Sequence, residues 1–238
     1  FIATGGTIAM KIDPVTKAVV PAISGDDLMQ SVPDAGQYAN IVVNNFSKMS
    51  ANYITNEWWA DLTETVQSTL DRPEVSGAII AQGTDTMEET AYWLDLTVDS
   101  PKPVVLIGAQ RNASSPDFDG PRNLLNGIRI AACPDAREKG VMVAMNNQIN
   151  AARSVTKTHT ANLETFQGGA FGLLGEVWDD KVVFSRAPLR RMHIPIKTKK
   201  WPVVHIFPMY AGADGMFIRH AVDNGADGIV VQAVGMGN

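Results

Sequence analysis

The chain has 238 residues, of which 45% are hydrophobic, and its formal net charge at pH 7 is -5. This composition predicts a globular protein with one large core or a core and an appendage, and the sequence contains no apolar run of about 18 residues that could cross a bilayer. Because nucleic-acid binding needs a concentrated basic face, the acidic balance argues against a nucleic-acid partner.

The lone cysteine, Cys133, permits no intrachain disulfide and stands at the expected end of a packed helix. A buried structural thiol is the plain interpretation, because a nucleophilic thiol would need an activating histidine beside it. The sequence leaves both the cytoplasm and the periplasm open as the compartment.

The chain begins with Phe1-Ile-Ala-Thr-Gly-Gly-Thr7, a short apolar run that predicts a buried strand and then meets glycine and a hydroxyl group. Residues 8–21 contain two prolines and no regular period, so we expect a long loop with hairpin character that could serve as a lid. Ser24 is placed to cap a short helix that ends near Pro33.

A strand is predicted at 41–43, a polar loop at 44–55, and an amphipathic helix at 56–70. Further strands are expected at 75–81, 103–109 and 140–145, with helices at 87–98 and 123–132 between them. Strands and helices that alternate at this spacing predict an α/β fold with a doubly wound, mostly parallel sheet of the flavodoxin or Rossmann kind.

From residue 148 the sequence favours hairpins, and a strand–helix–strand pattern returns at 202–207, 214–224 and 228–233. We therefore predict an N-terminal domain at 1–189, a linker at 190–201, and the beginning of a smaller α/β domain at 202–238. The linker holds a basic cluster, interpreted as a solvated connector, that consists of Arg190, Arg191, Lys197, Lys199 and Lys200.

A second glycine-and-threonine segment, Ile79-Ile-Ala-Gln-Gly-Thr-Asp-Thr86, follows another expected strand. Thr86 and Glu89 form a capping-box pattern at the start of the next helix. Thr84 and Asp85 precede that cap, where their side chains can face a crevice at the strand ends. A carboxylate there can hold a substrate ammonium group, and a hydroxyl can position a nucleophilic water or activate its neighbour.

Other interpretations of these residues remain open. A Gly-Gly-Thr turn could cradle a phosphate, although the chain has neither G-x-G-x-x-G there nor G-K-[ST], and Thr7 could be an ordinary helix cap. Lys157 lies among hydroxyl residues, where it could act as a base if buried near a threonine, or could be a solvated surface lysine. The four histidines have no metal-ligand spacing, so we predict no metal and no cofactor.

Taken together, Thr4-Gly-Gly-Thr-Ile-Ala9 and Gly83-Thr-Asp-Thr-Met-Glu-Glu-Thr90 resemble the two signatures of the bacterial-type L-asparaginases, a family that includes the glutaminase-asparaginases. Shorter matches follow in the same order, at 94–98, 102–105, 119–121, 155–158 and 235–238. The resemblance implies an amidohydrolase that releases ammonia from asparagine, with glutamine as a further candidate substrate, through a threonine nucleophile and an acyl-enzyme.

The resemblance also implies roles for individual residues. Thr7 matches the nucleophile, while Thr84, Asp85 and Lys157 match a hydrogen-bonded catalytic trio. Asp85 would contact the α-ammonium group of the substrate. Ser50 or, in a competing alignment, Ser47 would contact the α-carboxylate, with Thr84 and Gly83 beside the serine. The backbone of Ala109 would contact the side-chain amide. Asn238 matches an asparagine that family members lend to a neighbouring subunit, which implies a homo-oligomer built as a dimer of dimers.

Three departures from the family pattern bear on function. Residues 10–24 contain no tyrosine, and Val19 or Val20 stands near the position where the family places one on its flexible loop. Ala51 replaces the glutamine or glutamate that often follows the serine, and most of the family's smaller domain would lie beyond Asn238. An amino-acid-binding protein, or a homologue that acts weakly or on another ω-amide, is therefore the alternative.

Overall fold

A central sheet of eight strands forms the framework of the computed structural model, which describes residues 1–198 and 200–238. Its strand order is β12-β11-β8-β7-β6-β5-β1-β4. The parallel strands are β1 (Ile2–Gly5), β4 (Asn44–Met49), β5 (Ala78–Ala81), β6 (Val104–Ile107) and β7 (Val141–Met145). The antiparallel strands are β8 (Gln148–Ala151), β11 (Gly175–Trp178) and β12 (Lys181–Phe184).

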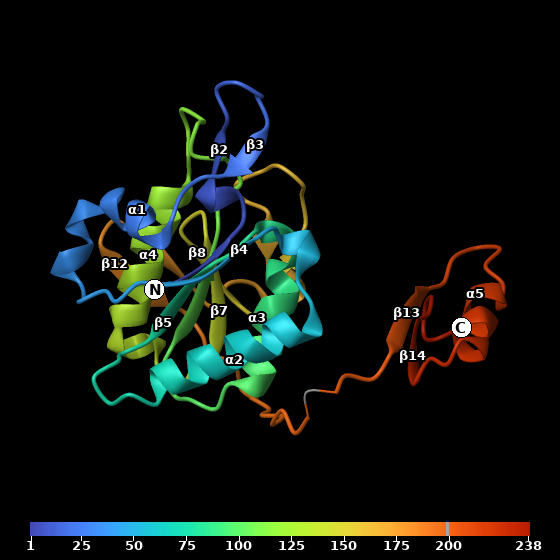
Figure 1. Ribbon diagram of the computed structural model, residues 1–238. Coiled ribbons are helices and arrows are strands. Elements are labelled where there is room, and N and C mark those ends of the chain that lie inside the picture. The colour runs from blue at the N-terminus through green and yellow to red at the C-terminus, as the bar shows by residue number, and fades with distance from the viewer. Residues whose placement is uncertain (199) are drawn as a thin grey trace. The chain divides into compact units, whose positions relative to one another are not determined.

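Four helices cover the two faces of this sheet: α1 (Gly25–Gln30), α2 (Asn56–Leu70), α3 (Met87–Thr97) and α4 (Gly120–Ala132). One core lies between the sheet and α1 and α4, and the other lies between the sheet and α2 and α3 (Figure 1). The alternation of side chains along a strand explains the division, since Ile79 belongs to the first core and Ile80 to the second. The predicted doubly wound α/β fold is confirmed.

The order of the parallel strands determines where a ligand can bind. Numbered along the chain, these five strands lie in the order 2-1-3-4-5, which is the flavodoxin-like arrangement. Its switch point falls between β1 and β5, because the chain leaves β1 toward one edge of the sheet and returns to β5 on the other side. Open α/β sheets bind ligands at the carboxyl ends of the strands at such a point.

One predicted strand is wrong. Residues 41–43 are not in a strand, and β4 instead occupies Asn44–Met49, within the stretch expected to be a polar loop. β4 is the edge strand beside β1 and is at most half-buried along its length. An edge strand with little burial tolerates polar side chains such as Asn44 and Ser47, so the apolar pattern that marks a central strand is missing.

Short strand pairs lie outside the central sheet. A hairpin of β2 (Met10–Ile12) and β3 (Val19–Pro21) projects from the part of the molecule that contains the central sheet (Figure 1). Here residues 8–21 were expected to form a long loop with hairpin character. A second short pair consists of β9 (Thr156–Lys157) and β10 (Phe166–Gln167). No described helix has both the length and the apolar character needed to cross a membrane.

The chain divides into two units, Phe1–Ile196 and Lys197–Asn238. The second unit consists of β13 (Val204–Pro208), α5 (Met216–Asp223) and β14 (Gly228–Gln232), with the two strands parallel. Residues 190–196, which the sequence assigns to the linker, belong to the first unit, where His193 Nε2 lies 3.2 Å from the carbonyl oxygen of Thr97. Lys199 of the predicted basic cluster lies outside the described residues.

Candidate active site

Two glycine-containing loops touch at the carboxyl ends of β1 and β5. Gly6 has a φ of 81°, and a Cβ added to it would lie 2.1 Å from the backbone nitrogen of Gly83. No side chain fits there, so glycine is required for this close approach. Thr7 and Thr84 each follow one of these glycines, so the two loops hold them on adjoining segments of backbone, as the strand-end pattern predicts.

Thr84, Asp85 and Lys157 form a connected trio. Lys157 Nζ donates to Thr84 Oγ1 at 2.8 Å and to Asp85 Oδ1 at 2.6 Å. The Lys157 side chain is only 13% exposed, whereas that of Asp85 is 73% exposed. Lys157 is therefore an enclosed cation directed at a threonine rather than a solvated surface lysine.

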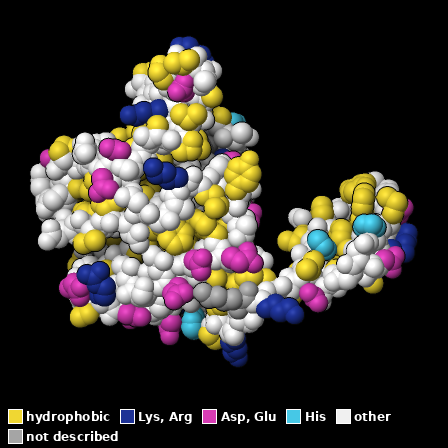
Figure 2. Space-filling view, in the orientation of Figure 1, with side chains coloured by type: hydrophobic (Ala, Val, Ile, Leu, Met, Phe, Trp, Pro, Cys, Tyr) yellow, Lys and Arg dark blue, Asp and Glu magenta, His cyan; other side chains and the backbone are white. Residues whose placement is uncertain are grey.

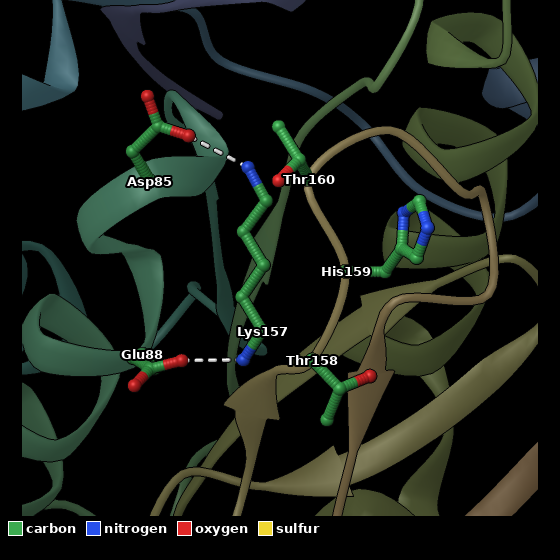
Figure 3. Close-up of a pocket in the computed structure, with 6 residues that line it drawn as sticks. All are labelled: Asp85, Glu88, Lys157, Thr158, His159 and Thr160. Atoms are coloured by element: carbon green, nitrogen blue, oxygen red, sulfur yellow. Dashed lines mark hydrogen bonds and ion pairs between the residues drawn. The ribbon is translucent and has the colours of Figure 1, made fainter.

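The backbone around Lys157 is fixed as well as its side chain. The backbone nitrogen of Lys157 donates to a carboxylate oxygen of Glu88, on the first turn of α3 (Figure 3). The extended Lys157 side chain thus runs between Glu88 at its backbone end and Asp85 at its tip. A recess of about 430 Å³ opens beside it and is lined by Asp85, Glu88, Lys157, Thr158, His159 and Thr160.

Thr84 has a second partner that the sequence did not single out. Its Oγ1 donates to Gln110 Oε1 at 3.0 Å, and Gln110 follows the fully buried Ala109 beyond the end of β6. The carboxylate of Asp119 holds this loop by accepting from the backbone nitrogen atoms of Gln110 and Arg111, at 3.1 and 2.9 Å. The one feature of the sequence that points to Gln110 is its position directly after the strand predicted at 103–109. In the structure this strand, β6, pairs with β5.

Thr7 has fewer polar neighbours than Thr84. Thr7 is half-buried at the start of a 3-10 turn, Thr7–Ala9, and its hydroxyl has no hydrogen-bond partner among the described residues. The β2–β3 hairpin follows directly and is attached to the loop after β6, where Ile12 N donates to Ser114 Oγ at 3.0 Å. In this hairpin Val19 is exposed and Val20 is half-buried.

The two serines that compete for one role have different surroundings. Ser47 Oγ donates to the carbonyl oxygen of Thr4 at 2.7 Å and accepts from Trp58 Nε1 at 3.3 Å, so its hydroxyl is used within the fold. Ser50 Oγ contacts only the side chain of Asn52, at 2.6 Å, among the described residues. Ser50 also precedes Ala51, whose side chain packs against Gly83.

The predicted capping box at Thr86 and Glu89 is wrong. Thr86 makes no side-chain cap on α3, and its hydroxyl instead donates to the carbonyl oxygen of Ala51 at 3.0 Å. The hydrogen bond to Ala51 ties the loop after β4 to the loop after β5, a contact between distant segments that a local pattern does not reveal. Partial burial and the neighbouring charge of Glu88 raise the pKa of the Glu89 carboxyl above its ordinary value.

The remaining residues of interest divide between the units. Gly83 and Ala109 lie in the first unit, whereas Asn238 lies in the second unit after β14. Within the described part of the chain, no group of three His, Cys, Asp or Glu side chains could hold a metal ion. On the face shown in Figure 2, basic and acidic side chains are interspersed.

Known proteins share both the sequence and this architecture. The model of the asparaginase family's N-terminal domain matches residues 1–190. The chain belongs to the asparaginase family. The resemblance seen in the two threonine motifs is thereby confirmed over most of the chain.

Individual asparaginases match the whole chain. L-asparaginase 2 of Escherichia coli (strain K12) is 37% identical over 245 residues, which cover 100% of this chain and 70% of that protein. A probable periplasmic L-asparaginase of Haemophilus influenzae is 38% identical, with the same coverage. The crystal structure of a probable cytoplasmic L-asparaginase from Campylobacter jejuni superposes with a TM-score of 0.92 at 36% identity, covering 100% of this chain and 75% of that one.

Proposed function

We propose that this protein hydrolyses the side-chain amide of L-asparagine to aspartate and ammonia. The observation that carries the proposal is the trio in which Thr84 Oγ1 lies 2.8 Å from Lys157 Nζ, on the loop that touches the Thr7 loop. Relatives that are 37% and 38% identical over the whole chain are named L-asparaginases, which supports the same reaction here. The alternative of a binding protein without turnover is not favoured.

Thr7 is the proposed nucleophile of the first half-reaction. Its Oγ1 forms a bond to the amide carbon of the substrate, the carbon–nitrogen bond breaks, and the hydroxyl proton leaves with the nitrogen as ammonia. The half-buried hydroxyl of Thr7 has no competing hydrogen bond from the described residues, which supports this role. Backbone N–H groups in the two glycine loops can stabilise the negative oxygen that develops during attack.

Thr84, Lys157 and Asp85 serve the second half-reaction. Water adds to the acyl carbon, the ester bond to Thr7 Oγ1 breaks, and one water proton returns to that oxygen. Thr84 stands where it can position this water, and the enclosed Lys157 ammonium provides positive charge beside the reacting atoms.

Three groups would recognise the substrate. One oxygen of Asp85 is engaged by Lys157, and the other has no partner among the described residues, so it can accept from the α-ammonium. Ser50, rather than the internally bonded Ser47, would contact the α-carboxylate, beside Gly83. The backbone of Ala109 would hold the amide group.

We also propose a homo-oligomer, a dimer of dimers, in which a neighbouring subunit completes each site. Asp85 is the most exposed member of the trio, which supports access from a second copy of the chain. Asn238 would contribute to the active site of the neighbouring subunit. Analytical ultracentrifugation of the full-length protein tests the assembly, with a tetramer expected and a monomer contradicting it.

The direct test of function is release of ammonia from L-asparagine, L-glutamine and D-asparagine by the full-length protein, with Thr7→Ala as the control. We expect turnover of L-asparagine that the substitution abolishes. Saturable binding of L-asparagine without ammonia would instead establish a binding protein, and equal turnover by Thr7→Ala would exclude Thr7 as the nucleophile.

A further inference from the structure

Gln110 joins Thr84 to a loop that lies far away in the sequence. Its Oε1 accepts from Thr84 Oγ1 at 3.0 Å, and its Nε2 donates to the carbonyl oxygens of Thr160 and Asn162 at 3.2 and 3.0 Å. A single side chain therefore touches both the catalytic hydroxyl and the loop after Lys157.

These contacts fix which end of the Gln110 amide faces Thr84. The carbonyl oxygens of Thr160 and Asn162 are acceptors only, so the NH₂ group must point to them. The amide oxygen then has to face Thr84, which removes the usual ambiguity between the two ends of a glutamine side chain.

The direction of the Thr84 hydroxyl follows. Lys157 Nζ can only donate, so it occupies one lone pair of Thr84 Oγ1 at 2.8 Å. The Gln110 oxygen can only accept, so it takes the single hydroxyl proton. One lone pair of Thr84 Oγ1 remains, and any further partner must be a hydrogen-bond donor.

We propose that Gln110 is a positioning residue: it takes the hydroxyl proton of Thr84, so that Thr84 Oγ1 can only accept from a further partner and thereby orients the hydrolytic water. The inference rests on the proposed function. A water that donates one proton to Thr84 Oγ1 keeps its oxygen lone pairs for the acyl carbon. The new carbon–oxygen bond forms, the ester bond to Thr7 breaks, one water proton returns to Thr7 Oγ1, and the second leaves as the product carboxyl ionises.

This arrangement also excludes one role for Thr84. A substrate carbonyl or developing oxyanion needs a donor, and the only proton of the Thr84 hydroxyl is directed at Gln110. Thr84 therefore serves water attack in the second half-reaction, whereas oxyanion stabilisation in the first falls to backbone N–H groups. Loss of Gln110 should slow reaction with water more than formation of the acyl-enzyme.

The test measures how the acyl-enzyme partitions between water and hydroxylamine. Full-length Gln110→Met is compared with the unsubstituted protein at a fixed hydroxylamine concentration, by quantifying aspartate and aspartyl hydroxamate. Because hydroxylamine is the stronger nucleophile and needs less orientation, we expect the ratio of hydroxamate to aspartate to rise about tenfold, the effect of one lost hydrogen bond. Meanwhile kcat/KM for ammonia release, which reports the first half-reaction, should fall less than about threefold.

Two further variants separate positioning from loop anchoring. Arg111 Nη1 donates a hydrogen bond to the same loop, at the carbonyl oxygen of Ala161, at 3.2 Å. Arg111→Met removes this hydrogen bond and leaves Thr84 untouched. The ratio of hydroxamate to aspartate should therefore equal that of the unsubstituted protein. Gln110→Glu retains an acceptor for Thr84 and should give a ratio between those of Gln110→Met and the unsubstituted protein.

The inference is overturned if Gln110→Met partitions like the unsubstituted protein, or if Arg111→Met changes the ratio as much as Gln110→Met. A loss of kcat/KM as large as the change in partition would also overturn it, because both half-reactions would then depend on Gln110. An unsubstituted protein that releases no ammonia would overturn the proposed function itself, and that outcome is distinct from an active enzyme with an unchanged ratio.

Discussion

The ends of β1 and β5 carry the same kind of motif, a glycine followed by threonine, yet their threonines have different surroundings. The Thr84 hydroxyl donates its proton to Gln110 and accepts from Lys157 with one of its two lone pairs. Thr7 has no partner for its hydroxyl among the described residues. Two neighbouring strand ends therefore offer one threonine that is fixed in direction and one that can rotate toward a substrate.

This difference supports the proposed division of the hydrolysis between two hydroxyl groups. A nucleophile must change partners during the reaction, so a hydroxyl without competing hydrogen bonds is suited to attack. A group that orients water benefits from a single fixed direction, because pre-organisation lowers the entropic cost of reaching the transition state. The comparison supports the first role for Thr7 and the second for Thr84 in the proposed reaction.

The largest expected effect is that of Thr7→Ala. Without a nucleophile the acyl-enzyme cannot form, and kcat for ammonia release should fall about 1,000-fold or more. Thr7→Ser retains a hydroxyl and should stay within about tenfold of the unsubstituted protein. Steady-state kinetics measure both, and a Thr7→Ala protein with more than a tenth of normal activity would remove the distinction between the two threonines.

Gly6→Ala tests the contact that brings the two loops together. The added Cβ would lie 2.1 Å from Gly83 N, at a φ of 81° that side chains rarely adopt. We expect a loss of about 3 kcal/mol in the free energy of unfolding, from overpacking and backbone strain together.

The matched control is Gly36→Ala, because a Cβ on Gly36 meets no atom within 4 Å. Urea denaturation should place this control within about 0.5 kcal/mol of the unsubstituted protein. Equal stability of the two variants would mean that the Gly6–Gly83 approach is not a constraint on the fold.

Thr84→Val preserves shape and removes the hydroxyl. Lys157 and the Gln110 oxygen each lose a hydrogen bond, and water loses its acceptor, so kcat should fall about 100-fold. Because the proposed first half-reaction does not use the Thr84 hydroxyl, rapid mixing with L-asparagine should show a burst of ammonia equal to the enzyme concentration. A proportional loss in the burst itself would place Thr84 in both half-reactions.

The smallest effects separate Ser47 from Ser50. Ser47→Ala removes hydrogen bonds to Thr4 and Trp58 and should cost about 1 kcal/mol of stability with little change in KM. Ser50→Ala should raise KM for L-asparagine about tenfold with little change in stability. A reversed pattern in thermal unfolding and kinetics would favour the competing alignment, in which Ser47 binds the α-carboxylate.

Much of this arrangement could be predicted from the sequence, because its signals are local. The apolar runs before Gly5 and before Gly83 predict buried strands, and in a parallel sheet their carboxyl ends meet at one edge. The sequence pattern therefore predicts Thr7 and Thr84 on adjoining loops. The position of Lys157 depended on the family resemblance, because nothing in its own segment indicates burial.

The features that sequence analysis missed depend on contacts between distant residues. β4 has the polar composition of an edge strand, which resembles a loop when no partner is known. Thr86 has the local pattern of a helix cap, but its hydroxyl bonds to Ala51, 35 positions earlier. Gln110 forms hydrogen bonds with Thr84 and Asn162, which are 26 and 52 positions away in the sequence. The periodicity of a sequence does not predict such contacts.

The most direct test of the account is to identify which threonine becomes acylated. Thr84→Val is mixed with L-asparagine, quenched in acid within the first turnover, and digested for peptide mass spectrometry. We predict an aspartyl adduct on the peptide that contains Thr7, at close to one per chain, and no adduct in Thr7→Ala. Continued turnover with no adduct on Thr7, or an adduct on Thr84 in the unsubstituted protein, would contradict the assignment of the two threonines.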